Sequence, residues 1–282
     1  MYPKWGVTTI LKSAVLKHGA DVNKRDKNNQ TPLHIAIRRN RFRLAGILLE
    51  HGADANADSE HNKVIAPLHM LLESQFHREG YVLGHALLFI KHGAKVNRRD
   101  QDNETPLHRT IRRNWFTLAD MLLEHGADPV AENNEGQTPL HILFQSNGDD
   151  VQNLMPLMVA SHSSCGRVDI ARVLLGRHGA NASAKDALGQ TPLHMVSRGA
   201  YISQEDGVGI AQLLLEHGAD INAQDNNHAT PLDIALHHGK LEIAELLLHY
   251  NDKDDAKVDQ GLTPNRLQLE VANLHEEPAP CT

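Results

Sequence analysis

A tetrapeptide, Thr-Pro-Leu-His, recurs along this chain and constrains its fold more than any other feature of the sequence. It begins at Thr31, Thr105, Thr138 and Thr191, with variants that begin at Ala66 and Thr230. A second motif, His-Gly-Ala, follows each of the first five copies. The step from Thr105 to Thr138 is 33 residues, since 138 − 105 = 33. A fixed period of this length predicts stacked repeats, because each small unit must bury its apolar face against a neighbour.

One complete unit, residues 26–58, shows how the repeat is expected to fold. Thr31 is a good N-cap, and Pro32 is tolerated in the first helical turn because its missing N–H would have no intrahelical partner there. Asn40 tolerates the left-handed conformation that reverses the chain, and Gly52 favours the end of a second helix. The pattern therefore predicts a helix, a turn, a second helix and an extended turn.

The two motifs, repeating in phase over roughly residues 6–264, resemble the ankyrin-repeat family. The phrases at 195–208 and 210–215 are also similar to ankyrin arrays of mushroom-forming fungi. The resemblance implies an all-α solenoid of helix–turn–helix units with β-hairpin-like turns. It also implies protein recognition through the inner helices and fingertips, structural roles for the Thr-Pro-Leu-His histidines, and no enzymatic activity.

The expected organisation is a single array over residues 1–275. It comprises a partial N-terminal unit (about 6–23), six units (about 24–257) and a partial C-terminal unit (about 258–275), followed by a disordered tail at 276–282. Units two and five each carry six extra residues, which we expect between their two helices. Unit four carries an insertion at about 147–166, which we expect to be partly ordered on the outside of the array. Whether the chain is part of a longer protein stays open.

Charge is distributed unevenly along the chain. Residues 1–116 hold 19 basic and 11 acidic residues, a net of 19 − 11 = +8, whereas residues 117–282 hold 9 and 24, a net of 9 − 24 = −15. A gradient of this kind bears on association rather than on fold. It predicts an acidic protein segment as the partner of the basic half.

The candidate binding residues belong to the ends of two inner helices and to two fingertips. Units one and three share an Ile-Arg-Arg-Asn phrase, and helix packing distances place the two arginine pairs about 20 Å apart along the concave groove. We expect the arginines to bind carboxylates and Trp115 to act as an exposed apolar anchor. The competing interpretation is a solvated face whose cations complement helix dipoles. The candidates are Arg38, Arg39, Arg41, Arg112, Arg113 and Trp115 at the helix ends, and Lys24, Arg25, Lys27, Arg98 and Arg99 at the fingertips.

Other functions find little support in the sequence. Eleven of the 20 histidines belong to the two motifs, and the others are not spaced as metal ligands are. We therefore expect no metal site, no cofactor and no catalytic activity. We do not expect nucleic-acid binding or a membrane span. Two cysteines favour a reducing compartment, the cytoplasm or the nucleus. The alternatives are the sensor portion of a larger signalling protein, or a rod whose basic and acidic ends meet in weak, salt-sensitive self-association.

Overall fold

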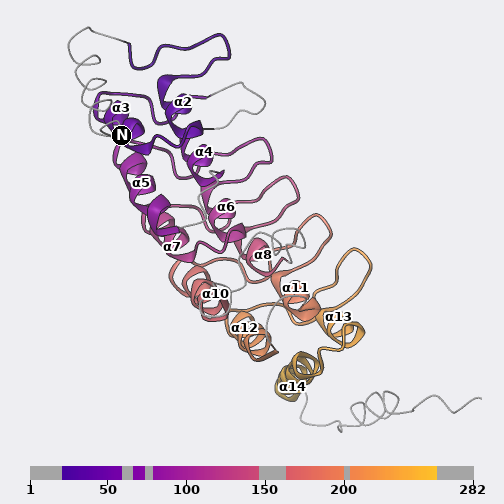
Figure 1. Ribbon diagram of the computed structural model, residues 1–282. Coiled ribbons are helices and arrows are strands. Elements are labelled where there is room, and N and C mark those ends of the chain that lie inside the picture. The colour runs from indigo at the N-terminus through magenta and orange to yellow at the C-terminus, as the bar shows by residue number, and fades with distance from the viewer. Residues whose placement is uncertain (1–20, 59–65, 74–78, 146–162, 200–203, 259–282) are drawn as a thin grey trace, which may run out of the picture.

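The computed structural model describes residues 21–58, 66–73, 79–145, 163–199 and 204–258, and the regular elements of these residues are all helices. Figure 1 shows two parallel rows of helices with extended loops projecting to one side. The expected all-α solenoid is confirmed. The inner row consists of α2 (Pro32–Arg38), α4 (Pro67–Glu73), α6 (Pro106–Arg112), α8 (Pro139–Phe144), α11 (Pro192–Arg198) and α13 (Pro231–His237).

The outer row pairs each inner helix with the helix that follows it, and neighbouring helices within each row are in contact. Its members are α3 (Phe42–Glu50), α5 (Glu79–Lys91), α7 (Phe116–Glu124), α10 (Ser163–Arg172) with the π-helical segment η2 (Val173–Arg177), α12 (Gln204–Glu216) and α14 (Leu241–Val258). The apolar core runs between the rows along the array. Its regular members are the leucines of the first motif, Leu33, Leu107, Leu140 and Leu193, which are all fully buried.

Local geometry follows the expected chemistry of the repeat. Thr31 is extended, at φ −85° and ψ 163°, and Pro32 occupies the first turn of α2. Asn40 has φ 56° and Gly52 has φ 84°, so both reversals use residues that tolerate the left-handed region. The helix–turn–helix reading of the unit is therefore confirmed.

In units two to five, the histidine of the first motif ties its unit to the next. In unit three, His108 Nδ1 accepts the Thr105 N–H at 3.2 Å and lies 2.9 Å from the Thr105 hydroxyl oxygen. His108 Nε2 lies 3.1 Å from the carbonyl oxygen of Gln137, the residue that precedes the next motif. His69, His141 and His194 make the same contact with the following unit. Burial lowers the pKa of each of these side chains, so they act as neutral imidazoles: His34, His69, His108, His141 and His194.

The extra residues of units two and five lie elsewhere than expected. The outer helices α5 and α12 have 13 residues each, whereas α3 and α7 have 9. Four of the six extra residues in each unit therefore lengthen the outer helix. Helical extension satisfies the backbone groups that a surface loop would leave to water.

A side-chain ladder joins successive His-Gly-Ala turns. Asn97 Nδ2 donates to the carbonyl of Gly126 at 2.8 Å, and its Oδ1 accepts the N–H of Asp128 at 2.8 Å. Asn23 and Asn56 bridge their next turns in the same way. The equivalent residue of the next turn is Val130, which cannot form either bond and is 45% exposed. The ladder is therefore interrupted between units three and four, whereas Ser183 bridges the turns of units four and five.

Replacing Val130 with asparagine should restore this rung and raise the free energy of unfolding by about 1 kcal/mol, the net value of typical intramolecular hydrogen bonds. The backbone turn is already in place, because the Val130 N–H donates to Asp128 Oδ1 at 3.0 Å as in the asparagine turns. Urea denaturation of Val130→Asn measures the gain. Asn97→Val, which removes an existing rung, is the mirror control and should lose a similar amount. Equal stability of the native chain and Val130→Asn would contradict the ladder.

Several sequence expectations concern residues outside the described ranges. Most of the partial N-terminal unit, the partial C-terminal unit beyond residue 258 and the tail at 276–282 lie there, as does most of the insertion at 147–166. The last four residues of that insertion, 163–166, form the beginning of α10. The C-terminal end of the insertion is thus helical and lengthens α10, the outer helix of unit four.

Candidate functional site

The turn between α2 and α3 carries three exposed arginines. Arg38 is the last residue of α2, Arg39 is its C-cap, and Arg41 precedes α3. Among the described residues, no carboxylate or other side chain pairs with these three guanidinium groups. The three guanidinium groups therefore face solvent without a counter-charge from the described residues. This makes the turn the candidate anion-binding site of the basic half.

The matching turn of unit three differs, and it corrects the expectation for Trp115. This side chain is only 7% exposed and belongs to the hydrophobic core, so it cannot serve as an exposed anchor. The Arg113 guanidinium covers it, with Cζ 4.8 Å from the ring centroid, a cation–π contact. Arg113 also donates to the backbone carbonyl of Glu73 at 3.4 Å.

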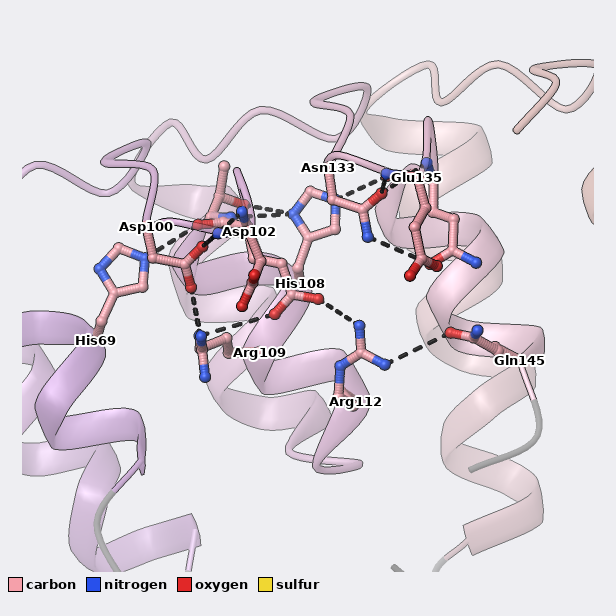
Figure 2. A network of polar contacts seen from close by, with 12 residues as sticks. His69, Asp100, Asp102, His108, Arg109, Arg112, Asn133, Glu135 and Gln145 are labelled. Atoms are coloured by element: carbon pink, nitrogen blue, oxygen red, sulfur yellow. Dashed lines mark hydrogen bonds and ion pairs between the residues drawn. The ribbon is translucent and has the colours of Figure 1, made fainter. Parts of the chain in front are cut away.

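Arg112 is held in an ion-pair network that crosses three units (Figure 2). It pairs with Glu104, and its Nη1 lies 3.5 Å from Gln145 Oε1. The two arginine pairs have the same sequence, but they therefore differ in whether they are free to bind a partner. The arginines of unit one face water, whereas those of unit three stabilise the array.

Arg109 is the centre of the same network and was not predicted from the sequence. Its guanidinium binds Asp100, with Nε 2.9 Å from Oδ2, and donates to Glu73 Oε1 at 2.6 Å. The Asp100 and Glu104 side chains are 2% and 9% exposed, so this arginine neutralises two buried carboxylates. Burial alone would raise the pKa of Asp100, but the hydrogen bond and charge of Arg109, together with the hydrogen bond from the Glu104 N–H, outweigh burial and lower the pKa.

A signal for Arg109 was present in the repeat pattern. Four residues after the first residue of the motif, all five other units have isoleucine or methionine in a described helix: Ile35, Met70, Ile142, Met195 and Ile234. Unit three has arginine there. A charged residue at an otherwise apolar repeat position indicates a buried counter-charge.

The fingertip residues fall into two groups. Arg25 and Arg99 donate to backbone carbonyls 33 residues ahead, those of Asp58 and Glu132, at 2.7 and 2.6 Å. Arg98 pairs with Asp58. These three arginines therefore join adjacent fingertips. Lys24 and Lys27 are exposed, and neither side chain forms a hydrogen bond or ion pair with a described residue.

No group of three or more His, Cys, Asp or Glu side chains among the described residues is arranged to hold a metal ion. None of the described helices is both long enough and apolar enough to cross a membrane.

Sequence comparisons agree with this geometry. A family profile described as ankyrin repeats (3 copies) matches residues 77–156 and 157–259, and one described as ankyrin repeats (many copies) matches residues 15–66. The chain belongs to the ankyrin-repeat family. Ankyrin repeats generally mediate protein–protein interaction and are typically non-catalytic modules.

Individual relatives share parts of the array. Mouse inversin is 29% identical over 185 residues, 64% of this chain and 15% of inversin. The Caenorhabditis elegans homolog of ankyrin repeat and LEM domain-containing protein 1 is 46% identical over 77 residues, 27% of this chain and 10% of the relative. Mouse Rabankyrin-5 is 42% identical over 77 residues, 27% of this chain and 6% of Rabankyrin-5. The matched regions thus span less than a sixth of these relatives.

Proposed function

We propose that this chain is a non-catalytic scaffold that binds an acidic segment of a protein partner through the α2–α3 turn. The observation that carries the proposal is the group of three exposed arginines, Arg38, Arg39 and Arg41, which lacks a counter-charge among the described residues. Adjacent cations repel one another, so an incoming carboxylate gains charge-assisted hydrogen bonds and relieves that repulsion. Lys24 and Lys27 add exposed positive charge at the fingertip of the same unit.

The site proposed here is narrower than the groove expected from the sequence. Arg112 and Arg113 are engaged within the array, and Trp115 is buried. Unit one therefore supplies the main contact, and unit three supplies the rigid frame beside it. The acidic partner is unidentified, and its chemistry follows from the charge of the site.

A charge-reversal experiment tests the proposal. A rhodamine-labelled oligoaspartate of 20 residues should bind the native chain at low ionic strength, and Arg38→Glu/Arg39→Glu/Arg41→Glu should weaken binding at least about tenfold, because three close charge pairs are lost. Fluorescence anisotropy at 20 and 200 mM salt measures both affinities.

The matched control makes the same change in net charge at other exposed positions. Lys91→Glu/Lys95→Glu/Arg177→Glu carries an identical charge reversal at exposed positions outside the turn. We expect it to weaken binding only about twofold, through the long-range field of the protein. Equal weakening by the two triple variants would show that only net charge matters and would overturn the proposed site.

The charge gradient favours one second candidate, a head-to-tail contact between the basic half of one chain and the acidic half of another. The halves carry +8 and −15, so the contact is expected to weaken with salt. Static light scattering at 20 and 200 mM salt distinguishes this self-association from a monomeric scaffold.

A further inference from the structure

A second group of basic side chains lies at the C-terminal ends of α11 and α13. Arg198 is the last residue of α11, His237 is the last residue of α13, and His238 and Lys240 follow it. Counted from the first residue of the motif, these positions correspond to those of Arg38, Arg39 and Arg41 in unit one. We call Arg198, His237, His238 and Lys240 the distal basic patch.

Contacts between two units hold the distal basic patch together. Helices α11 and α13 pack against each other. Lys240 lies across the turn that follows α11, since a Cβ placed on Gly199 would stand 2.7 Å from Lys240 Cε. The rings of His237 and His238 lie edge to face with centroids 5.1 Å apart. The four side chains are therefore neighbours by packing, although Arg198 and Lys240 are distant in sequence.

The distal basic patch gathers like charges without a counter-charge. None of its four side chains pairs with a carboxylate of the described residues, and Arg198, His237 and His238 are exposed. The charges that act on the His238 imidazole are all positive, those of His237, Arg198 and Lys240; Glu242, in the first turn of α14, is the acidic residue next along the chain. Partial burial lowers the pKa of His238, and these cations lower it further.

Helix dipoles do not account for this grouping. A cation at a helix C-terminus complements the dipole, which would explain Arg198 and His237 individually. Lys240 instead precedes the positive N-terminus of α14, where the dipole disfavours a cation. The patch also lies in the half of the chain that carries −15, so it is a local reversal of the surrounding charge.

We infer that the distal basic patch is a second anion-binding site, which takes carboxylate side chains of the same acidic partner segment. This inference rests on the proposed function, because it supplies a second contact for that partner. Five helix-to-helix steps separate α2 from α13, or about 45 Å at 8–10 Å per step. An extended chain of about 15 residues spans that length. The partner segment is therefore expected to be a long acidic stretch lying along the edge formed by the ends of the inner helices.

Binding at this site is linked to proton uptake. A bound carboxylate favours the charged form of an imidazole beside it, so the patch should hold anions more tightly as pH falls through the histidine range. The arginines of unit one stay charged throughout and give no such dependence. The pH dependence of binding therefore distinguishes the distal basic patch from the arginines of unit one.

The test measures the affinity of the 20-residue rhodamine-labelled oligoaspartate at pH 7.5 and pH 6.0 by fluorescence anisotropy. Oligoaspartate is ionised at both values. We expect the native chain to bind about tenfold more tightly at pH 6.0, because added positive charge on the patch acts at close range. His237→Gln/His238→Gln should reduce this gain below about threefold.

A control variant, His228→Asn/His249→Gln, removes two exposed histidines outside the patch and should keep the full gain; asparagine tolerates the positive φ of residue 228. Circular dichroism at pH 6.0 shows that each variant is folded. An unchanged pH gain in His237→Gln/His238→Gln, or no binding by the native chain at pH 6.0, overturns the distal site. Failure of the unit-one site would give a different result. In that case, Arg38→Glu/Arg39→Glu/Arg41→Glu would bind the oligoaspartate at pH 7.5 as tightly as the native chain does.

Discussion

Replacing Arg109 with isoleucine should lower the free energy of unfolding by about 3 kcal/mol, the cost of breaking a buried ion pair from one side. The substitution leaves the Asp100 side chain, which is 2% exposed, without its guanidinium partner, and leaves Glu104 with Arg112 alone. Isoleucine itself suits the position, because Ile35 and Ile142 occupy it in units one and four. The loss therefore measures unpaired charge rather than poor packing.

A triple variant serves as the matched rescue. Asp100→Asn/Glu104→Gln/Arg109→Ile gives unit three the residues that unit four has at the same positions, Asn133, Gln137 and Ile142. The Asn133 side chain already accepts two backbone N–H groups of its turn at 2.9 Å, as the Asp100 side chain does. We expect the triple variant to return to within about 1 kcal/mol of the native chain.

Urea denaturation followed by the fluorescence of the buried Trp115 reports on this unit, in a Trp5→Phe background that removes the other tryptophan. Arg109→Ile and the triple variant are compared with that background. If the triple variant were as unstable as Arg109→Ile, packing around the new isoleucine would explain the loss, and the charge argument would be wrong.

Acidification should destabilise the array steeply between about pH 6.5 and pH 5. The five motif histidines have pKa values lowered by burial, so the unfolded chain binds protons in this range that the native chain does not. Stability is then fully present above the ordinary histidine pKa and is lost as pH falls below it. Each histidine that stays neutral in the native state adds about 1.4 kcal/mol per pH unit.

Urea denaturation at pH 7.5, 6.5 and 5.5 measures the slope. His141→Asn removes one of the five imidazoles while keeping an acceptor near Thr138, so it should be less stable at pH 7.5 but less sensitive to acid by about 1.4 kcal/mol per pH unit. An unchanged slope in this variant would show that the buried histidines are not the groups that titrate.

The repeat motifs predicted the fold well because they encode local geometry. Pro32 fixes its own φ, and Asn40 and Gly52 tolerate the left-handed region, and their roles in the structure match those expected. The burial of Trp115 could not be predicted in this way. It depends on Arg113 lying over the ring and on the packing of the neighbouring helices, both of which are tertiary contacts.

The candidate site was predicted only in part for the same reason. Arg38 and Arg112 occur in identical sequence phrases, but Arg112 forms an ion pair with Glu104. The residue of unit one that is equivalent to Glu104 is the uncharged Gln30. A comparison of that position between the units would have distinguished the two arginines. The distal basic patch was hidden by the −15 of its half, because a sum of charges cannot show which side chains are neighbours.

Hydrogen exchange with and without the oligoaspartate tests the central claim most directly. Residues 36–46 and 110–120 form the equivalent turns of units one and three, so each serves as the internal reference for the other. We predict that the oligoaspartate protects amides of 36–46 and leaves those of 110–120 unchanged, because only the first turn offers arginines that are not engaged within the array. Equal protection of the two turns, or protection of 110–120 alone, would contradict the proposed site.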